Sequence, residues 1–301
     1  MKINEQYGLQ AKLVVSVLRH IARENIFALK GGTAINFFVQ NFPRLSVDID
    51  LAYIGFEKRA EAINIINSTL DKMVNDLKRV NISSAVTTSE GDLKRIVCSN
   101  SETKIKIDMN YTARGYAYPP IIKPLNIKLQ KEFGELEMQL LSIAELYGGK
   151  ICAALNRQHP RDLFDIKILF DNEGITEEIK NGFIVCLLGD NGSPYELLAP
   201  NIKDQREVLR INFDGMTDIK FTYQDHEKTL QKLIKTLHKS LTKADKDFIL
   251  GFFSLKPKWD LIDIPNIQKL SAVQWKIKNL EKMSKEKLEE HLQKTKEALN
   301  I

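Results

Sequence analysis

Two aspartates one residue apart, Asp48 and Asp50, are the first candidates for chemistry and lie in the stretch RLSVDIDLAYI. Apolar and polar residues alternate there with period two, which predicts a strand whose alternate side chains share a face. Adjacent carboxylates repel one another unless a cation lies between them. A divalent ion with oxygen ligands, Mg²⁺ above all and otherwise Mn²⁺, would relieve the repulsion. The alternative is a solvated sheet face, although aspartate is uncommon in strands.

A third carboxylate, Asp108, lies in TKIKIDMNY, a second alternating stretch. Ile105 and Ile107 would face the core, so Lys106 and Asp108 would face the other way. An adjacent strand would bring Asp108 beside Asp48 and Asp50. These three carboxylates are the predicted ligands of a two-metal site, and the place of Asp108 depends on that strand pairing.

Gly31, Gly32 and Thr33 precede the aspartates, between a short apolar run and a short predicted helix. Glycines let a backbone approach a phosphate closely, and the N–H groups at a helix N-terminus bind anions. The hydroxyl of Thr33 adds a donor. Most glycine pairs are simple turns, but one that precedes a carboxylate pair outlines a nucleoside triphosphate (NTP) site. We therefore predict an NTP as substrate.

The pattern around these motifs indicates a mixed first part and a helical second part. The predicted class is α+β, a mixed sheet with flanking helices at 1–125 followed by a mainly helical domain at 126–301. Predicted helices span 9–24, 33–40 and 57–79, predicted strands span 44–54, 82–90, 93–100 and 103–111, and helices dominate from about residue 140.

Composition excludes several classes of protein. Hydrophobic residues make up 43% and charged residues 28%, the balance of a soluble protein. No apolar run approaches the length of a membrane helix, and the N-terminus lacks the apolar region of a signal peptide. Cys98, Cys152 and Cys186 are far apart and read as reduced thiols. We expect a cytoplasmic protein with no membrane partner. The net charge of +5 permits a nucleic-acid partner without requiring one.

A second charged group lies at 142–165, SIAELYGGKICAALNRQHPRDLFD. Ser142 and Glu145 form a capping pattern that predicts a helix, and Pro160 fits the first turn of another. From spacing alone, the charged side chains could form a surface ion-pair network of small energetic weight. The positions concerned are Lys150, Arg157, Arg161, Asp162 and Asp165.

Lysines recur on one face of a helix predicted over 228–246, KTLQKLIKTLHKSLTKADK, with leucines on the opposite face. A solvated face is one interpretation. A contact surface for nucleic-acid phosphates is the other, and its affinity would fall with salt. The central candidates for that contact are Lys232, Lys235 and Lys239.

The pattern Gly31-Gly32-Thr33 followed by Arg44-x-Ser46-x-Asp48-x-Asp50 resembles the first motif of DNA polymerase β-type nucleotidyltransferases. More narrowly, it resembles the AbiEii (MenT-like) family of bacterial toxin–antitoxin and phage-defence systems. The segment Lys150 to Asp165, of form K-x6-R-x3-R-D-x2-D, resembles that family's second motif. The resemblance extends over roughly residues 25–280.

This resemblance implies a nucleotidyltransferase-fold domain and a helical domain that completes the active-site groove. The implied reaction moves a nucleoside monophosphate from an NTP to an acceptor hydroxyl. The implied acceptor is the 3′ end of tRNA, and the implied role is that of a toxin held in check by an antitoxin. Arg161 would contact a phosphate or pair with an aspartate. The implied nucleotide contacts include Ser46, Lys150, Arg157 and Arg161, and the implied catalytic set adds Lys150, Asp162 and Asp165 to the three strand carboxylates.

Two rival functions stay open on this sequence. The same chemistry could serve a small molecule or a protein side chain as acceptor. A non-catalytic regulator that binds nucleotide or RNA could also keep the fold, although the complete carboxylate set argues against it.

Overall fold

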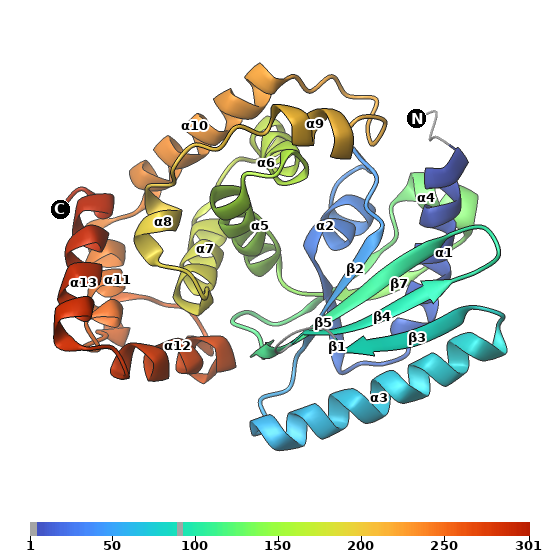
Figure 1. Ribbon diagram of the computed structural model, residues 1–301, viewed down its shortest axis with the longest axis horizontal. Helices are drawn as coiled ribbons and strands as arrows, with labels where there is room; N and C mark the ends of the chain where they lie inside the picture. Colours follow the sequence, from blue (N-terminus) through green and yellow to red (C-terminus); the bar gives the residue numbers. More distant parts are fainter. Residues whose placement is uncertain (1–4, 89–92) are drawn as a thin grey trace. The chain divides into compact units, whose positions relative to one another are not determined.

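The computed structural model describes residues 5–88 and 93–301, and the chain forms two compact units (Figure 1). The first extends to Ser142 and includes Gly215–Lys220, and the second comprises Ile143–Asp214 and Phe221–Ile301. A mixed sheet with flanking helices and a mainly helical remainder confirm the predicted α+β class. The chain divides later than the predicted boundary after residue 125, because Ile121–Pro124 and Glu137–Leu140 are strands of the sheet.

The described residues of the first unit form one seven-stranded sheet in the order β3-β4-β5-β2-β1-β7-β6. The strand with the two aspartates, β2, lies near the middle, parallel to β5 and antiparallel to β1. The predicted strand at 82–90 is confirmed as far as Thr88, and its last two positions lie outside the described residues. The strands are β1 (Phe27–Lys30), β2 (Asp48–Tyr53), β3 (Ser83–Thr88), β4 (Leu93–Ser99), β5 (Lys104–Arg114), β6 (Ile121–Pro124) and β7 (Glu137–Leu140).

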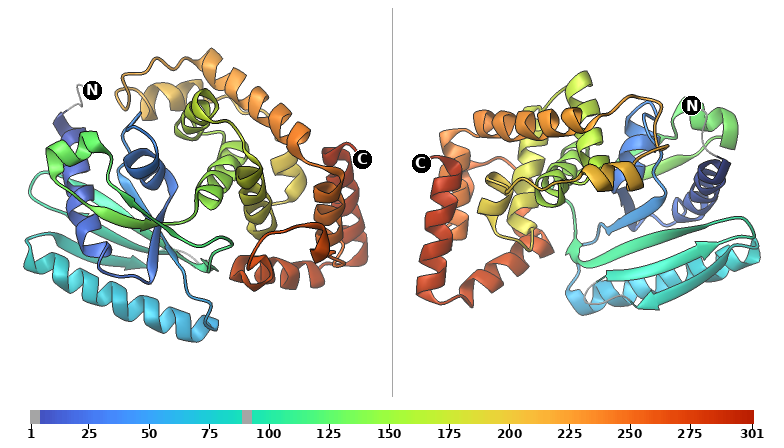
Figure 2. Two further views of the ribbon diagram at one scale, coloured as in Figure 1. Left: turned by 180° about the vertical axis from the view of Figure 1, so that it is seen from behind. Right: turned by 45° about the horizontal axis from the view of Figure 1, so that its top comes forward.

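Two long helices supply apolar faces to this sheet. One is α1 (Glu5–Ile21), which contacts β5, and the other is α3 (Arg59–Arg79), which runs alongside β3 in each view (Figures 1 and 2). Ile49 and Leu51 of β2 are fully buried, and the alternation of a strand turns Asp48 and Asp50 to the opposite face. The short helical elements are α2 (Gly31–Ala34), the π-helical turn η1 (Ile35–Val39) and α4 (Ile127–Phe133).

The second unit is built around a close helix pair, α5 and α7. A Cβ atom on Gly148 of α5 would overlap the backbone of Gly182 in α7, so the absence of side chains lets the helices touch. No helix in the described part of the chain is long and apolar enough to cross a membrane. The helices are α5 (Ile143–Arg157), α6 (Pro160–Asn172), α7 (Glu177–Gly189), α8 (Pro194–Leu198), α9 (Arg206–Asn212), α10 (Tyr223–Ser240), α11 (Lys243–Phe253), η2 (Trp259–Leu261), η3 (Ile267–Lys269), α12 (Ser271–Glu281) and α13 (Lys285–Leu299).

The single helix predicted over 228–246 is wrong, because the chain breaks between α10 and α11. Thr242 caps α11: its hydroxyl accepts a hydrogen bond from the backbone N–H of Asp245, whose carboxylate accepts one from the N–H of Thr242. This capping box starts a new helix and ends the predicted one early. Only the lysines up to Lys239 therefore share the face of α10.

Candidate active site

The three predicted carboxylates lie on the same face of the sheet, on adjacent strands. In the pairing of β2 with β5, Asp50 is the partner of Asp108 and Asp48 is the partner of Lys106. Asp48 and Asp50 are half-buried, and Ile49 between them is fully buried. The expected adjacency of the two strands is thus confirmed. We call Asp48, Asp50 and Asp108 the carboxylate cluster.

The two glycines pack directly against side chains of the carboxylate cluster and of the segment that leads into β2. Gly31 follows β1 directly, has a left-handed φ of +73°, and would place any Cβ atom against the Asp50 carboxylate. A Cβ atom on Gly32 would lie 2.9 Å from Oγ of Ser46 and 3.0 Å from Nη2 of Arg44. Neither position has room for a larger residue. The glycines, Ser46 and Asp50 therefore form one tightly packed turn.

Buried polar groups hold the chain that leads into β2. The hydroxyl of Thr33 donates a hydrogen bond to the carbonyl of Asp48 and lies 3.0 Å from the hydroxyl of Ser46. Arg44, only 2% exposed, donates to the carbonyl of Leu45 at 2.7 Å. Thr33 and Arg44 thus position the aspartates. A phosphate contact by Thr33 stays a prediction.

An arginine joins the carboxylate cluster from the neighbouring strand β4. Arg95 donates from Nε to Oδ1 of Asp108 at 2.6 Å and from Nη2 to Oδ2 at 2.8 Å. The hydrogen bond to Asp108 and the charges of Asp108, Asp48 and Asp50 raise the pKa of Arg95 above its usual value, against an opposing effect of burial. The cluster therefore contains its own fixed cation.

This arrangement decides how well the cluster fits a divalent metal ion. Asp48 and Asp50 offer carboxylates on one sheet face, the hard oxygen ligands that Mg²⁺ and Mn²⁺ require. Both oxygens of Asp108 already accept hydrogen bonds from Arg95. Within residues 5–88 and 93–301, no group of three or more ligating side chains converges on one point. The fit is therefore to Asp48 and Asp50, with Asp108 acting as the partner of Arg95.

In the second unit, the charged residues of the second motif form a buried cluster. Nζ of Lys150 lies 2.8 Å from Oδ1 of Asp162 and 2.9 Å from Oδ2 of Asp165. These side chains are 6%, 1% and 0% exposed. The expected proximity is confirmed. The alternative of a surface ion-pair network is wrong for these three residues, because α5 and α6 pack them inside. We call them the buried ion cluster. A phosphate contact by Lys150 stays a prediction.

Two arginines lie at the edge of the buried ion cluster. Arg157 is 62% exposed and donates from Nε to Oδ2 of Asp162 at 2.5 Å. Burial by itself raises the pKa of Asp162, but the charges and hydrogen bonds of Lys150 and Arg157 outweigh burial and hold the pKa below its ordinary value. Asp162 is therefore ionised at neutral pH. Arg161 is half-buried in the first turn of α6.

These features can be compared with known proteins. The sequence profile described as nucleotidyl transferase AbiEii toxin, type IV toxin–antitoxin system, matches residues 13–264. The chain belongs to the AbiEii family. Membership confirms the predicted nucleotidyltransferase toxin of a toxin–antitoxin system and adds that the system is of type IV.

Other comparisons bear on the fold of this AbiEii protein. No curated protein matches the chain. Among solved structures, it is similar to MenT4, a nucleotidyltransferase toxin from Mycobacterium tuberculosis H37Rv, with a TM-score of 0.60 and 12% identity. The match covers 83% of this chain and 89% of that chain. At this identity the likeness shows a shared fold.

The lysine face of the AbiEii protein is shorter than predicted. Lys232 stacks over the ring of Phe170, 4.3 Å from its centroid, and so is partly held in place. On α11, Lys243 pairs with Asp247 and Lys246 donates to a backbone carbonyl near the C-terminus. The α10 lysine face consists of the exposed residues Lys228, Lys232, Lys235 and Lys239, and a nucleic-acid contact there stays a prediction.

Sequence reasoning missed the cations that surround the carboxylate cluster. Arg95 is the cross-strand partner of Asp108, and Lys30 is the partner of Asp50. Alternation placed Lys106 on the face of Asp108, but no local pattern shows which strand lies beside which. The signal for Arg95 would have been its position in an alternating strand, read together with the pairing of β4 and β5.

Replacement of Arg95 by glutamine should tighten the binding of Mn²⁺. The change removes the competing cation and releases both oxygens of Asp108, so we expect the dissociation constant to fall roughly fivefold, about 1 kcal/mol. Isothermal titration with Mn²⁺ measures it. Arg79→Gln is the control, because Arg79 forms an exposed pair with Asp76 elsewhere on the unit. Equal or weaker binding by Arg95→Gln would contradict the assignment.

Proposed function

We propose that this AbiEii protein transfers a nucleoside monophosphate from an NTP to the 3′-hydroxyl of an RNA, with tRNA as the expected class. The transfer would stop growth in the cytoplasm until a cognate antitoxin restrains the protein. The observation that carries the proposal is the packing of Asp50 against Gly31. It joins a glycine turn suited to phosphate with carboxylates suited to a divalent ion.

In this proposal each group of the first unit has a separate task. The turn at Gly31 and Gly32, with the Ser46 hydroxyl, orients the triphosphate. Asp48 and Asp50 would hold Mg²⁺ or Mn²⁺, and the bound ion would supply positive charge beside the α-phosphate. The acceptor oxygen attacks the α-phosphorus, and the bond from that phosphorus to the pyrophosphate oxygen breaks. The hydroxyl proton passes to a carboxylate of the cluster.

The second unit would contribute in two ways. The buried ion cluster stabilises the junction of α5 and α6. Arg157 and Arg161 are more exposed than Lys150, so they are better candidates than Lys150 for phosphate contacts. The α10 lysine face supplies positive charge to an RNA backbone. Lys232, Lys235 and Lys239 have no acidic residue three or four positions away on α10, which favours a polyanionic partner over a small neutral acceptor.

Incubation of the purified protein with Mg²⁺, each α-labelled NTP in turn and total tRNA tests the proposal. We expect label on tRNA from at least one NTP, and no label on tRNA whose 3′-terminal diol has been oxidised with periodate. Label on a small molecule or on the protein alone would favour the corresponding acceptor. Binding of NTP without any transfer would favour a regulator and refute catalysis.

A further inference from the structure

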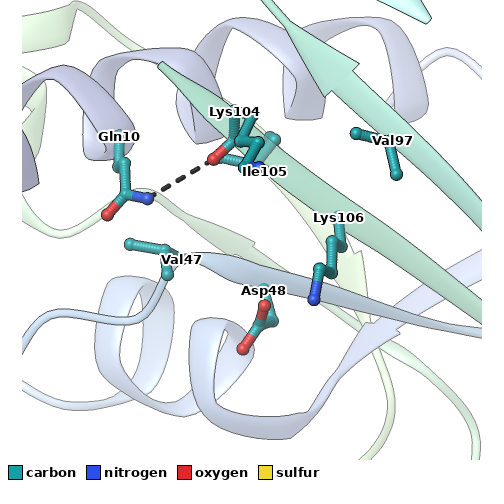
Figure 3. Close-up of a pocket in the computed structure, with 7 residues that line it drawn as sticks. All are labelled: Gln10, Val47, Asp48, Val97, Lys104, Ile105 and Lys106. Carbon is teal, nitrogen blue, oxygen red and sulfur yellow. Dashed lines mark hydrogen bonds between the residues drawn. The ribbon is translucent and has the colours of Figure 1, made fainter. Parts of the chain in front are cut away.

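A pocket of about 280 Å³ lies directly beside Asp48, within the first unit (Figure 3). Val47 and Val97 give it aliphatic walls, and Lys104 and Lys106 of β5 line it as well. In Figure 3, Lys106 lies next to Asp48, its partner in the strand pairing. The pocket therefore combines apolar surface with two ammonium groups at the edge of the candidate active site.

The two lysines are available to an anionic ligand. Both are exposed, and neither ammonium group has a hydrogen-bond or ion-pair partner in the described part of the chain. Their side chains share a strand face two residues apart, about 6.6 Å along the strand. Gln10 of α1 donates to the carbonyl of Lys104 at 3.4 Å and closes one end of the pocket. Two such charges can contact successive phosphates of an extended single strand.

Sheet topology places this pocket opposite the glycine turn. The turn at Gly31 and Gly32 follows β1 on one side of β2, whereas the lysines lie on β5 on the other side. Asp48 and Asp50 lie between them on β2. Displacement at phosphorus places the entering and leaving oxygens roughly in line on opposite sides. With the triphosphate at the glycine turn, as proposed above, this in-line geometry favours approach of the attacking hydroxyl from the side of β5.

We propose that this pocket binds the 3′-terminal nucleoside of a single-stranded nucleic-acid acceptor, and that Lys104 and Lys106 contact its last phosphates. The inference rests on the proposed function and deepens it. The aliphatic walls suit the face of a base or sugar. The volume lies just below the usual range of small-ligand sites, about 300–1,000 Å³, and so suits one terminal residue.

The double variant Lys104→Gln/Lys106→Gln tests the charges. The probe is a short fluorescent single-stranded RNA ending in a 3′-deoxynucleoside, and anisotropy gives its dissociation constant over a series of NaCl concentrations. We expect about tenfold weaker binding and a salt slope smaller by about 1.4, since each single-strand phosphate contact contributes about 0.7. The control is Lys123→Gln/Lys131→Gln, exposed residues on β6 and α4 at the far edge of the sheet. An unchanged slope, or the same change in the control, would overturn the proposal.

A second variant tests the cavity without altering charge. Val97→Phe suits a strand and fills the pocket, so the KM for the RNA acceptor should rise about tenfold or more while the dissociation constant of the NTP stays unchanged. An unchanged KM for RNA would overturn the pocket assignment even if transfer itself is efficient. Failure of the wild-type protein to bind NTP or label any acceptor would refute the proposed function instead.

Discussion

Replacement of Asp50 by asparagine should lower the rate of nucleotide transfer by about 10³-fold or more while the protein stays folded. Asparagine has nearly the shape of aspartate, so it still fits against Gly31, where the backbone leaves no room for a larger group. It lacks the negative charge that, in the proposed mechanism, would hold a divalent ion and would take the proton of the attacking hydroxyl. The large loss follows because both tasks depend on charge rather than on packing.

The measurement is the initial rate of label transfer at saturating NTP, together with thermal unfolding of the same preparation. Asp71→Asn is the matched control, because Asp71 is 66% exposed on α3 and undergoes the same chemical change. In bacteria, a culture expressing Asp50→Asn should grow as well as one with an empty vector. Transfer at the wild-type rate by the variant would rule out a catalytic role for the strand aspartates.

Replacement of Lys150 by methionine should lower the free energy of unfolding by about 3–5 kcal/mol. The ammonium group of Lys150 lies within 3 Å of both Asp162 and Asp165, and all three side chains are buried. Methionine fills a similar volume but leaves two carboxylates in the interior without their shared cation. Removal of one partner from a buried ion cluster destabilises the folded state by more than the intact cluster stabilises it, because the remaining charges stay desolvated.

Urea unfolding followed by circular dichroism measures this effect. Lys167→Met is the control, since Lys167 pairs with Asp171 on the same helix α6 but near the surface, where such pairs contribute about 0–1 kcal/mol. If Lys150→Met unfolds at the same urea concentration as the wild type and no longer binds NTP, the prediction is wrong. Lys150 would then serve the nucleotide and contribute little to the fold.

Low pH should destabilise the wild-type protein through the buried ion cluster. The pKa of Asp162 lies below its ordinary value in the folded state, so the folded state binds fewer protons than the unfolded state. The resulting stabilisation is complete above the unfolded pKa of about 3.9 and is lost as pH falls through the folded value. In Lys150→Met, the pKa of Asp162 should be higher, and the urea midpoint should begin to fall at higher pH.

Local pattern was enough to predict much of the site. Period-two alternation assigned Asp48 and Asp50 to one face, and the alternation of TKIKIDMNY assigned Asp108 to a second strand. Pro160 correctly marked the start of α6. These assignments succeeded because they depend on backbone geometry within a few residues. The break before α11 was also readable, since Thr242 and Asp245 have capping-box spacing, but the regular recurrence of lysines obscured it.

The pairing of segments that are distant in the sequence determined the partners of the charged side chains. Only the register of β4 with β5 brings Arg95 onto Asp108, and the role of Asp108 as a metal ligand stays a prediction. Only the packing of α5 with α6 buries Lys150 between Asp162 and Asp165, which spacing alone does not distinguish from a surface ion pair. The sequence alone determined which residue types alternate and where elements begin. Which elements become neighbours depends on the burial of apolar faces from distant segments, and this choice sets the partner of every charged group at the site.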